Sequence, residues 1–185
     1  YAIKEELLNS TEHYPYSLAN TDKSYLVYSL YYDSPTYSNF WEKIDGLKDR
    51  KKFRFRVYDI NAINEPDVYL EIKRKKNLVT VKDRLKLDYK TYISALSNGW
   101  NALLGDRTLS LDQKKVADEF VYNTLCSNLY PTVLVAYRRE AFFGKYQSNI
   151  RINLDSYIKS YKSEKLFLLY KQPDTYPLDP NNPPP

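Results

Sequence analysis

The sequence predicts an α+β fold in which an antiparallel β-barrel forms a tunnel, flanked by a few short helices. Several segments alternate apolar with charged or polar side chains, as strands with one buried face do. Three of these segments are joined by connections short enough for antiparallel hairpins. The segments with helical periodicity are few, which is typical of an α+β arrangement and not of a doubly wound one.

The strands are predicted from runs rich in Val, Ile, Tyr and Phe that are bounded by turn-forming residues. "SYLVYSLYYD" is the first of them. The predicted strands are Ser24–Asp33, Phe53–Asp59, Val68–Lys75, Val79–Leu87, Pro131–Gly144 and Asn149–Ile158, with Leu166–Tyr170 as a further candidate.

Helices are predicted from capping residues and from apolar side chains three and four positions apart. Lys4–Asn9 and Tyr89–Trp100 form two of them. Ser34 as N-cap and Pro35 at the first helical position begin another, with an apolar face of Tyr37, Phe40, Trp41 and Ile44. Ser110 and Gln113 match a capping box, and the helix that they open has an apolar stripe of Val116, Phe120, Val121 and Leu125.

The 185 residues suit a single domain, residues 1–185, which ends in a proline-rich connecting loop at residues 173–185. The chain begins at Tyr1 and contains no Met, so we expect it to be truncated at both ends. No apolar run approaches the roughly 18 residues of a membrane helix, so no direct membrane insertion is expected. The single Cys126 favours a cytoplasmic location, with any membrane tether in a region outside this segment.

Positive charge is concentrated in one part of the sequence. Residues 43–90 contain 15 Lys and Arg against 8 Asp and Glu, whereas the rest of the chain contains 13 against 15. A basic band of this kind indicates a polyanionic partner.

The strand periodicity places these cations on shared faces. In "KKFRFRV", Lys52, Arg54 and Arg56 alternate with Phe53 and Phe55, and Glu71, Lys73 and Lys75 share a face of their strand, as do Lys82, Arg84 and Lys86 of theirs. One reading is a solvated sheet face, where Lys and Arg are harmless. However, cations that face one another across strands repel, and a barrel would turn this face into a tunnel suited to a chain of phosphates.

Nucleic acid is the main competing partner, because single-strand binders combine basic grooves with exposed aromatic side chains. Here Phe53 and Phe55 lie on the face opposite to the cations, which argues against a stacking platform. No GxxxxGK[ST] or GxGxxG motif is present, and the chain has only four Gly. Phosphates must therefore be bound by side chains, and we expect no nucleic-acid partner.

The sequence resembles the VTC domain, the catalytic domain of the vacuolar transporter chaperone polyphosphate polymerases, within the triphosphate tunnel (CYTH-like) superfamily. The motifs that carry the resemblance occur in the expected order between Tyr25 and Asp155: "SLYYDSP", "FWEKIDGLKDRKKFRFRVYD", "YLEIKRK", "VKDRL", "YRREAF" and "RINLD".

The resemblance implies a basic tunnel and the metal-dependent transfer of the γ-phosphate of ATP to a polyphosphate chain, with Mn²⁺ or Mg²⁺ as cofactor. Catalytic roles carry over to Arg54, Arg56, Lys73, Lys82, Arg139 and Arg151. Phosphate binding is assigned to Lys43 by the resemblance and to Lys75, Arg84 and Lys86 by the charged faces. The implied ligands are ATP, polyphosphate or triphosphate.

The family's first E-x-K motif and its last E-x-K strand, which supplies the principal metal carboxylate, are absent from this sequence. Glu71 and Asp155 remain as metal-ligand candidates, but each can instead have a structural role, and for Glu71 a salt bridge with the lysines is favoured over metal binding. A non-catalytic module for polyphosphate or inositol phosphates stays open as an alternative. A triphosphatase is the other alternative; it needs more carboxylates to activate water, so the Lys/Arg bias favours a polymerase.

Overall fold

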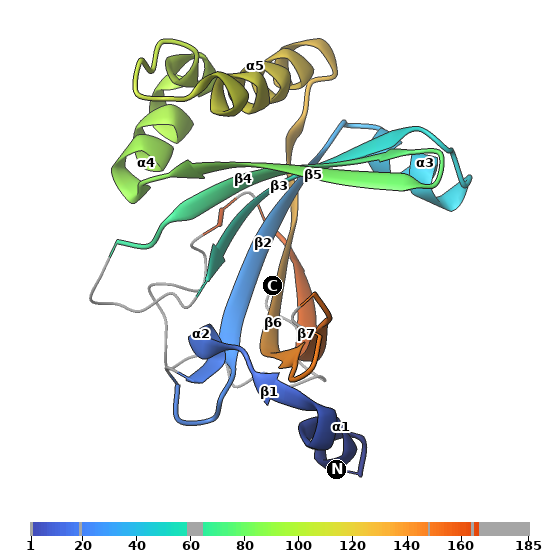
Figure 1. The fold of residues 1–185 in the computed structure, drawn as a ribbon. Coiled ribbons are helices and arrows are strands. Elements are labelled where there is room, and N and C mark those ends of the chain that lie inside the picture. Colours follow the sequence, from blue (N-terminus) through green and yellow to red (C-terminus); the bar gives the residue numbers. More distant parts are fainter. Residues whose placement is uncertain (1, 19, 59–64, 148, 164, 167–185) are drawn as a thin grey trace. The chain divides into compact units, whose positions relative to one another are not determined.

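The computed structural model describes residues 2–18, 20–58, 65–147, 149–163 and 165–166 (Figure 1). The chain divides into two compact units, which we call the small unit (residues 1–27 and 136–159) and the large unit (residues 28–135 and 160–185). Strands β2 (Tyr25–Asp33), β6 (Tyr130–Gly144) and β7 (Arg151–Lys162) each contribute residues to both units. Each unit is described by itself below.

The strands form a sheet in the order β1-β6-β2-β3-β4-β5, and β7 pairs with β6. The remaining strands are β1 (Thr11–His13), β3 (Arg50–Tyr58), β4 (Val68–Lys76) and β5 (Val79–Leu87). The pairs β1–β6, β3–β4 and β4–β5 are antiparallel. The predicted α+β class with an antiparallel sheet is therefore confirmed.

The core of the large unit lies between strands β3–β5 and three helical segments, α4 (Tyr89–Asn98), η1 (Trp100–Leu103) and α5 (Leu111–Cys126) (Figure 1). The Phe55 ring is at its centre, stacked on Trp100 at 4.8 Å and edge-on to Phe120 at 5.2 Å. Phe53 and Phe55 are both buried. Burying one such ring stabilises the fold by about 2–3 kcal/mol, which ties the apolar face of β3 to the helices.

Helix α5 begins as the sequence predicts. The Ser110 hydroxyl accepts a hydrogen bond from the Gln113 N–H, and the Gln113 side chain accepts one from the Ser110 N–H. Val116, Phe120 and Val121 are buried, but Leu125, the last member of the predicted stripe, is exposed. Leu125 lies in the final turn of α5, one turn beyond Val121.

Helix α3 (Ser38–Ile44) begins later than predicted, because its first turn is capped from outside the helix. Tyr37, not Ser34, is the N-cap, and it adopts a left-handed backbone conformation (φ 56°). The Asp33 carboxylate accepts hydrogen bonds from the N–H groups of Asn39 and Phe40. No residue of α3 is buried, so the predicted apolar face of this helix is not part of the core.

In the large unit, the β4–β5 hairpin extends past α4 and α5 (Figure 1). Leu85 and Leu87 are buried, whereas Val79 and Val81 on the same face of β5 are exposed. The predicted apolar face of β5 is therefore buried only along the half that α4 and α5 cover.

The small unit contains α1 (Ala2–Ser10), β1 and α2 (Pro15–Leu18). Helix α1 includes the predicted helix. Strand β1 lies in the segment that was expected to be a polar connection. It pairs with β6, Thr11 opposite Gly144 and His13 opposite Phe142, and a contact so distant in the sequence leaves no local signal. The candidate strand Leu166–Tyr170 beyond its first residue, and the loop at residues 173–185, lie outside the described residues. Within the described ranges, no helix is long and apolar enough to cross a membrane.

Candidate functional site

Strands β3, β4 and β5 of the large unit carry a charged face opposite to the helices. Side chains at positions i and i+2 share a face of a strand, so the charged residues lie opposite to Phe53 and Phe55. The strand register places two rows of three side by side: Lys52–Lys73–Lys82 and Arg54–Glu71–Arg84.

Glu71 lies at the centre of this face and is 1% exposed. Its Oε2 accepts a hydrogen bond from Arg54 Nε at 2.8 Å, and its Oε1 accepts one from Arg84 Nε at 2.9 Å. Arg56 Nη1 is 3.8 Å from Oε2, and Lys82 Nζ is 3.6 Å from Oε1. Both carboxylate oxygens are therefore occupied by cations.

The ion pairs keep Glu71 charged despite its burial. Burial by itself raises the pKa of a carboxyl group, but the charges of Arg54 and Arg56 and the hydrogen bonds from Arg84 and Arg54 outweigh it. The pKa of Glu71 is lowered to about 2. At neutral pH the cluster of Arg54, Arg56, Glu71 and Arg84, called the Glu71 cluster below, thus holds one permanent negative charge among three guanidinium groups.

Each of the three arginines also donates a hydrogen bond to a hydroxyl group. Arg54 Nη1 donates to the Tyr31 hydroxyl at 2.8 Å, and Arg84 Nη2 donates to the Tyr58 hydroxyl at 3.0 Å. The buried Arg56 donates from Nε to the Ser29 hydroxyl at 3.0 Å. These contacts hold the planar guanidinium groups in fixed orientations, which is what bidentate recognition of a phosphate needs.

Beside the Glu71 cluster is a cavity of about 330 Å³ in the large unit, which we call the cation cavity. Six of the eight side chains that line it are cationic: Lys43, Arg50, Lys52, Arg54, Lys73 and Lys75. The other two are Tyr31 and Thr80. None of the described residues that line this cavity carries a carboxylate.

The four lysines of the cation cavity form no ion pair with any residue in the described part of the chain. Arg50 donates a hydrogen bond from Nη1 to the carbonyl oxygen of Leu47 at 2.6 Å, which is a neutral acceptor. Burial and the neighbouring charge of Lys43 lower the pKa of Lys52. The cations thus raise one another's electrostatic energy in the absence of an anion. A bound polyanion would remove this repulsion.

The structure brings together several residues that the sequence analysis assigned separately. Lys43, Lys73 and Lys75 line the cation cavity with Arg54. Lys86 is exposed and pairs with Asp67 at 2.8 Å, so its charge is already compensated.

The sequence analysis assigned no site role to four residues of the cation cavity: Tyr31, Arg50, Lys52 and Thr80. It did place Lys52 on the charged face of its strand. Arg50 precedes Lys52 on the same face of β3, because the strand begins three residues earlier than predicted, and extending the alternation backwards would have found it. Tyr31 comes from β2, and the sequence pattern holds no signal for its contact with Arg54.

The other predicted residues belong to the small unit. Arg139 donates two hydrogen bonds to the Asp155 carboxylate, from Nε at 2.6 Å and from Nη2 at 2.7 Å. These hydrogen bonds to the Asp155 carboxylate raise the pKa of Arg139. The Arg151 guanidinium lies 4.6 Å from the centre of the Tyr14 ring.

The two predicted metal ligands do not fit a divalent cation as they stand. Glu71 accepts from arginines at both oxygens, and Asp155 is held in a bidentate pair by Arg139. No group of three or more His, Cys, Asp or Glu side chains among the described residues could hold a metal ion. Both carboxylates are thus engaged by arginines in this arrangement.

A comparison with protein families finds a match over almost the whole chain. The family model described as the VTC domain matches residues 1–178. No curated protein matches the chain.

Proposed function

Because this chain belongs to the VTC domain family, we propose that its large unit binds a chain of phosphates in the cation cavity and that the domain is an ATP-dependent polyphosphate polymerase. The observation that carries the proposal is a cavity wall with six cations and no carboxylate. We place the activity in the cytoplasm, where ATP is available.

Phosphate chains suit this site better than single carboxylates or nucleic-acid bases do. A triphosphate presents several charges within a few ångströms, which can neutralise neighbouring cations such as Lys52 and Lys73 together. Lysines act as mobile point charges, while the prearranged Arg54 offers a planar pair of donors. The Phe53 and Phe55 rings, which could stack on bases, are buried on the opposite face.

Transfer of a phosphoryl group from ATP to polyphosphate requires mainly that the two phosphate chains are positioned and that their charges are neutralised. In phosphoryl transfer between phosphates, the attacking oxygen is already an anion, so no side chain has to remove a proton from it. Two phosphate chains repel each other, and the unpaired lysines offset this repulsion when the chains are brought into line. Glu71 acts as a positioning residue, because it holds the guanidinium group of Arg54, which lines the cation cavity, while Glu71 itself does not line it.

Titration of tripolyphosphate into the protein by calorimetry tests the binding proposal. Replacing Lys73 and Lys75 together by Gln should weaken binding by at least about tenfold, because each lost charge-assisted contact is worth about 1.5–3 kcal/mol. The double variant Lys90→Gln, Lys115→Gln removes the same charge at exposed positions and should change affinity by less than about twofold. Equal losses in both double variants would mean that the phosphate responds to net charge alone.

A module that binds polyphosphate without turnover is the second candidate. It is favoured by the engagement of Glu71 and Asp155 with arginines, which leaves neither carboxylate free for a catalytic metal. Incubation with ATP and Mn²⁺, followed by gel detection of polyphosphate, separates the two. New polyphosphate supports the polymerase, and tight tripolyphosphate binding without any product supports the binding module.

A further inference from the structure

The turn of the β4–β5 hairpin carries an apolar side chain where polar ones are usual. Lys76 pairs with Val79, so Asn77 and Leu78 form a two-residue turn, in which Asn77 adopts a left-handed backbone conformation (φ 53°). Turns of this length favour Asn, Asp and Gly. Leu78 is 95% exposed, so neither turn chemistry nor packing in the core explains an apolar side chain there.

Further apolar side chains are exposed next to this turn. Val79 is 63% exposed, and Leu47, in the connection between α3 and β3, is 47% exposed. The Asn77 N–H donates a hydrogen bond to Asp49 Oδ1 at 3.3 Å, which holds the turn beside this connection. Figure 1 shows α3 and the hairpin turn at the same end of the large unit. We call Leu47, Leu78 and Val79 together the tip surface.

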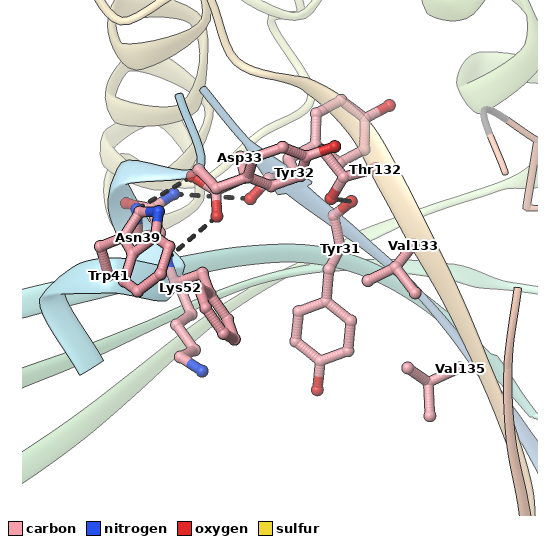
Figure 2. Close-up of a pocket in the computed structure, with 11 residues that line it drawn as sticks. Tyr31, Tyr32, Asp33, Asn39, Trp41, Lys52, Thr132, Val133 and Val135 are labelled. Carbon is pink, nitrogen blue, oxygen red and sulfur yellow. Dashed lines mark hydrogen bonds between the residues drawn. The ribbon is translucent and has the colours of Figure 1, made fainter. Parts of the chain in front are cut away.

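The backbone that carries the tip surface is held by hydrogen bonds on both sides of α3. At the start of the helix, the Asp33 carboxylate accepts hydrogen bonds from the N–H groups of Asn39 and Phe40 (Figure 2). Beyond its end, the Leu47 N–H donates to the carbonyl oxygen of Glu42 at 2.9 Å. A surface whose backbone is already ordered loses less conformational freedom when it binds a partner.

Uncompensated positive charge lies next to the tip surface in the sequence. Lys48 follows Leu47, Lys76 precedes the turn, and both lysines are exposed. Neither forms an ion pair with a residue in the described ranges, and neither lines the cation cavity. Exposed apolar side chains flanked by lysines are the pattern of a surface that attaches to an anionic bilayer.

We propose that the tip surface attaches the large unit to a lipid bilayer that contains anionic lipids, with Leu78 and Val79 among the headgroups and Lys48 and Lys76 at the lipid phosphates. A protruding apolar turn is surrounded on all sides by a fluid bilayer, whereas a protein partner would need a matching concave pocket for it. The proposal concerns attachment to the surface of a bilayer, not a membrane-spanning segment. It adds a contact within this segment to the tether that the sequence analysis placed outside it.

Co-sedimentation of the full chain with vesicles made of equal parts of phosphatidylcholine and phosphatidylserine tests the apolar part of the contact. The double variant Leu78→Ser, Val79→Ser should weaken partitioning by at least about tenfold, because two apolar side chains no longer leave water. The matched control is Leu111→Ser, Leu125→Ser, which removes two exposed apolar side chains from α5. The control should change partitioning by less than about twofold.

The same vesicles test the charged part of the contact. Lys48→Gln together with Lys76→Gln should weaken partitioning by at least about tenfold, since each lysine near an anionic bilayer contributes about a factor of five. Lys90→Gln together with Lys115→Gln removes the same charge elsewhere and should weaken it by less than about twofold. Vesicles of phosphatidylcholine alone should bind the unchanged protein at least about tenfold more weakly than the mixed vesicles.

Three results would overturn the proposal. The unchanged protein could fail to sediment with mixed vesicles, or both serine variants could behave alike. Release of the protein from mixed vesicles by excess tripolyphosphate would mean that lipid headgroups had bound in the cation cavity. Binding of tripolyphosphate to the cation cavity is a separate measurement, so the proposed function stands or fails independently of the tip surface.

Discussion

At the scale of single residues, Glu71 has the largest influence on the site. A buried carboxylate is costly to transfer from water unless it is paired, and here three arginines compensate it while it compensates them. Without Glu71, Arg54 and the buried Arg56 would have no counter-charge close by. One acidic residue thus makes a dense cationic face compatible with folding.

We expect Glu71→Gln to lower the free energy of unfolding by about 3 kcal/mol, because it removes one partner of a buried ion-pair network. Urea unfolding at neutral pH measures the change. Glu65→Gln, which removes the exposed partner of Lys90 at 3.9 Å, should cost less than about 0.5 kcal/mol. An unchanged stability of Glu71→Gln would show that the arginines need no buried counter-charge.

The pH dependence of the same variant gives an independent check. The folded-state pKa of Glu71, about 2, lies below its ordinary value of 4.5, so its stabilisation is fully present above that value and is lost as the pH falls toward 2. The difference in unfolding free energy between the unchanged protein and Glu71→Gln should therefore shrink between about pH 5 and pH 2. A difference that stayed constant over this range would contradict the lowered pKa.

At the scale of elements, α3 depends on a residue outside it. The Asp33 carboxylate, at the end of β2, accepts hydrogen bonds from the N–H groups of Ser34, Asn39 and Phe40. The helix has no side-chain cap of its own and buries none of its residues. Asp33 therefore sets the position of α3, and with it the positions of Lys43 and Trp41.

Asp33→Ala should lower the free energy of unfolding by about 1–2 kcal/mol, since the buried N–H group of Ser34 and two part-buried N–H groups of α3 lose their acceptor. It should also weaken tripolyphosphate binding, because Lys43 is displaced with the helix. Urea unfolding and calorimetry measure the two effects. Asp118→Ala, at an exposed position within α5, is the control and should leave both quantities unchanged. Full affinity in Asp33→Ala would show that α3 keeps its place without this contact.

At the scale of the whole molecule, the charge is divided between parts of the chain. The basic band of residues 43–90 lies entirely within the large unit, and the cavity without carboxylates is lined mostly by residues from this band. In the small unit, by contrast, Arg138, Arg139 and Lys4 each pair with a carboxylate. Attraction for polyanions should accordingly be a property of the large unit.

Affinity should increase with the number of phosphates, from phosphate through pyrophosphate to tripolyphosphate, because each added group reaches further unpaired lysines. Adenosine alone should not compete with tripolyphosphate, since it carries no charge. Rising salt should weaken binding, although less steeply than at an open surface, where charges more than about 10 Å apart are largely screened at 0.1 M salt. Competition calorimetry at two salt concentrations measures these effects. A preference for an oligonucleotide over a polyphosphate of equal charge would contradict the assignment.

The sequence alone was sufficient for features that depend on local periodicity and local hydrogen bonds. The alternation of Arg54 and Arg56 with Phe53 and Phe55 determines which side chains share a face, because neighbouring residues of a strand must point to opposite sides. The capping box of Ser110 and Gln113 begins α5 where it was predicted, since both partners lie within one turn.

Only the tertiary structure decided which charges are compensated and which are not. The sequence presents Glu71, Lys73 and Lys75 as neighbours on one strand, yet Glu71 pairs with Arg54 and Arg84 from two other strands. Neither lysine forms an ion pair with a carboxylate of the residues that the structure describes. The strand register sets these distances, and the register depends on packing across the whole sheet. The position of α3 depends in the same way on Asp33, which precedes the helix by several residues, so local signals placed its start too early.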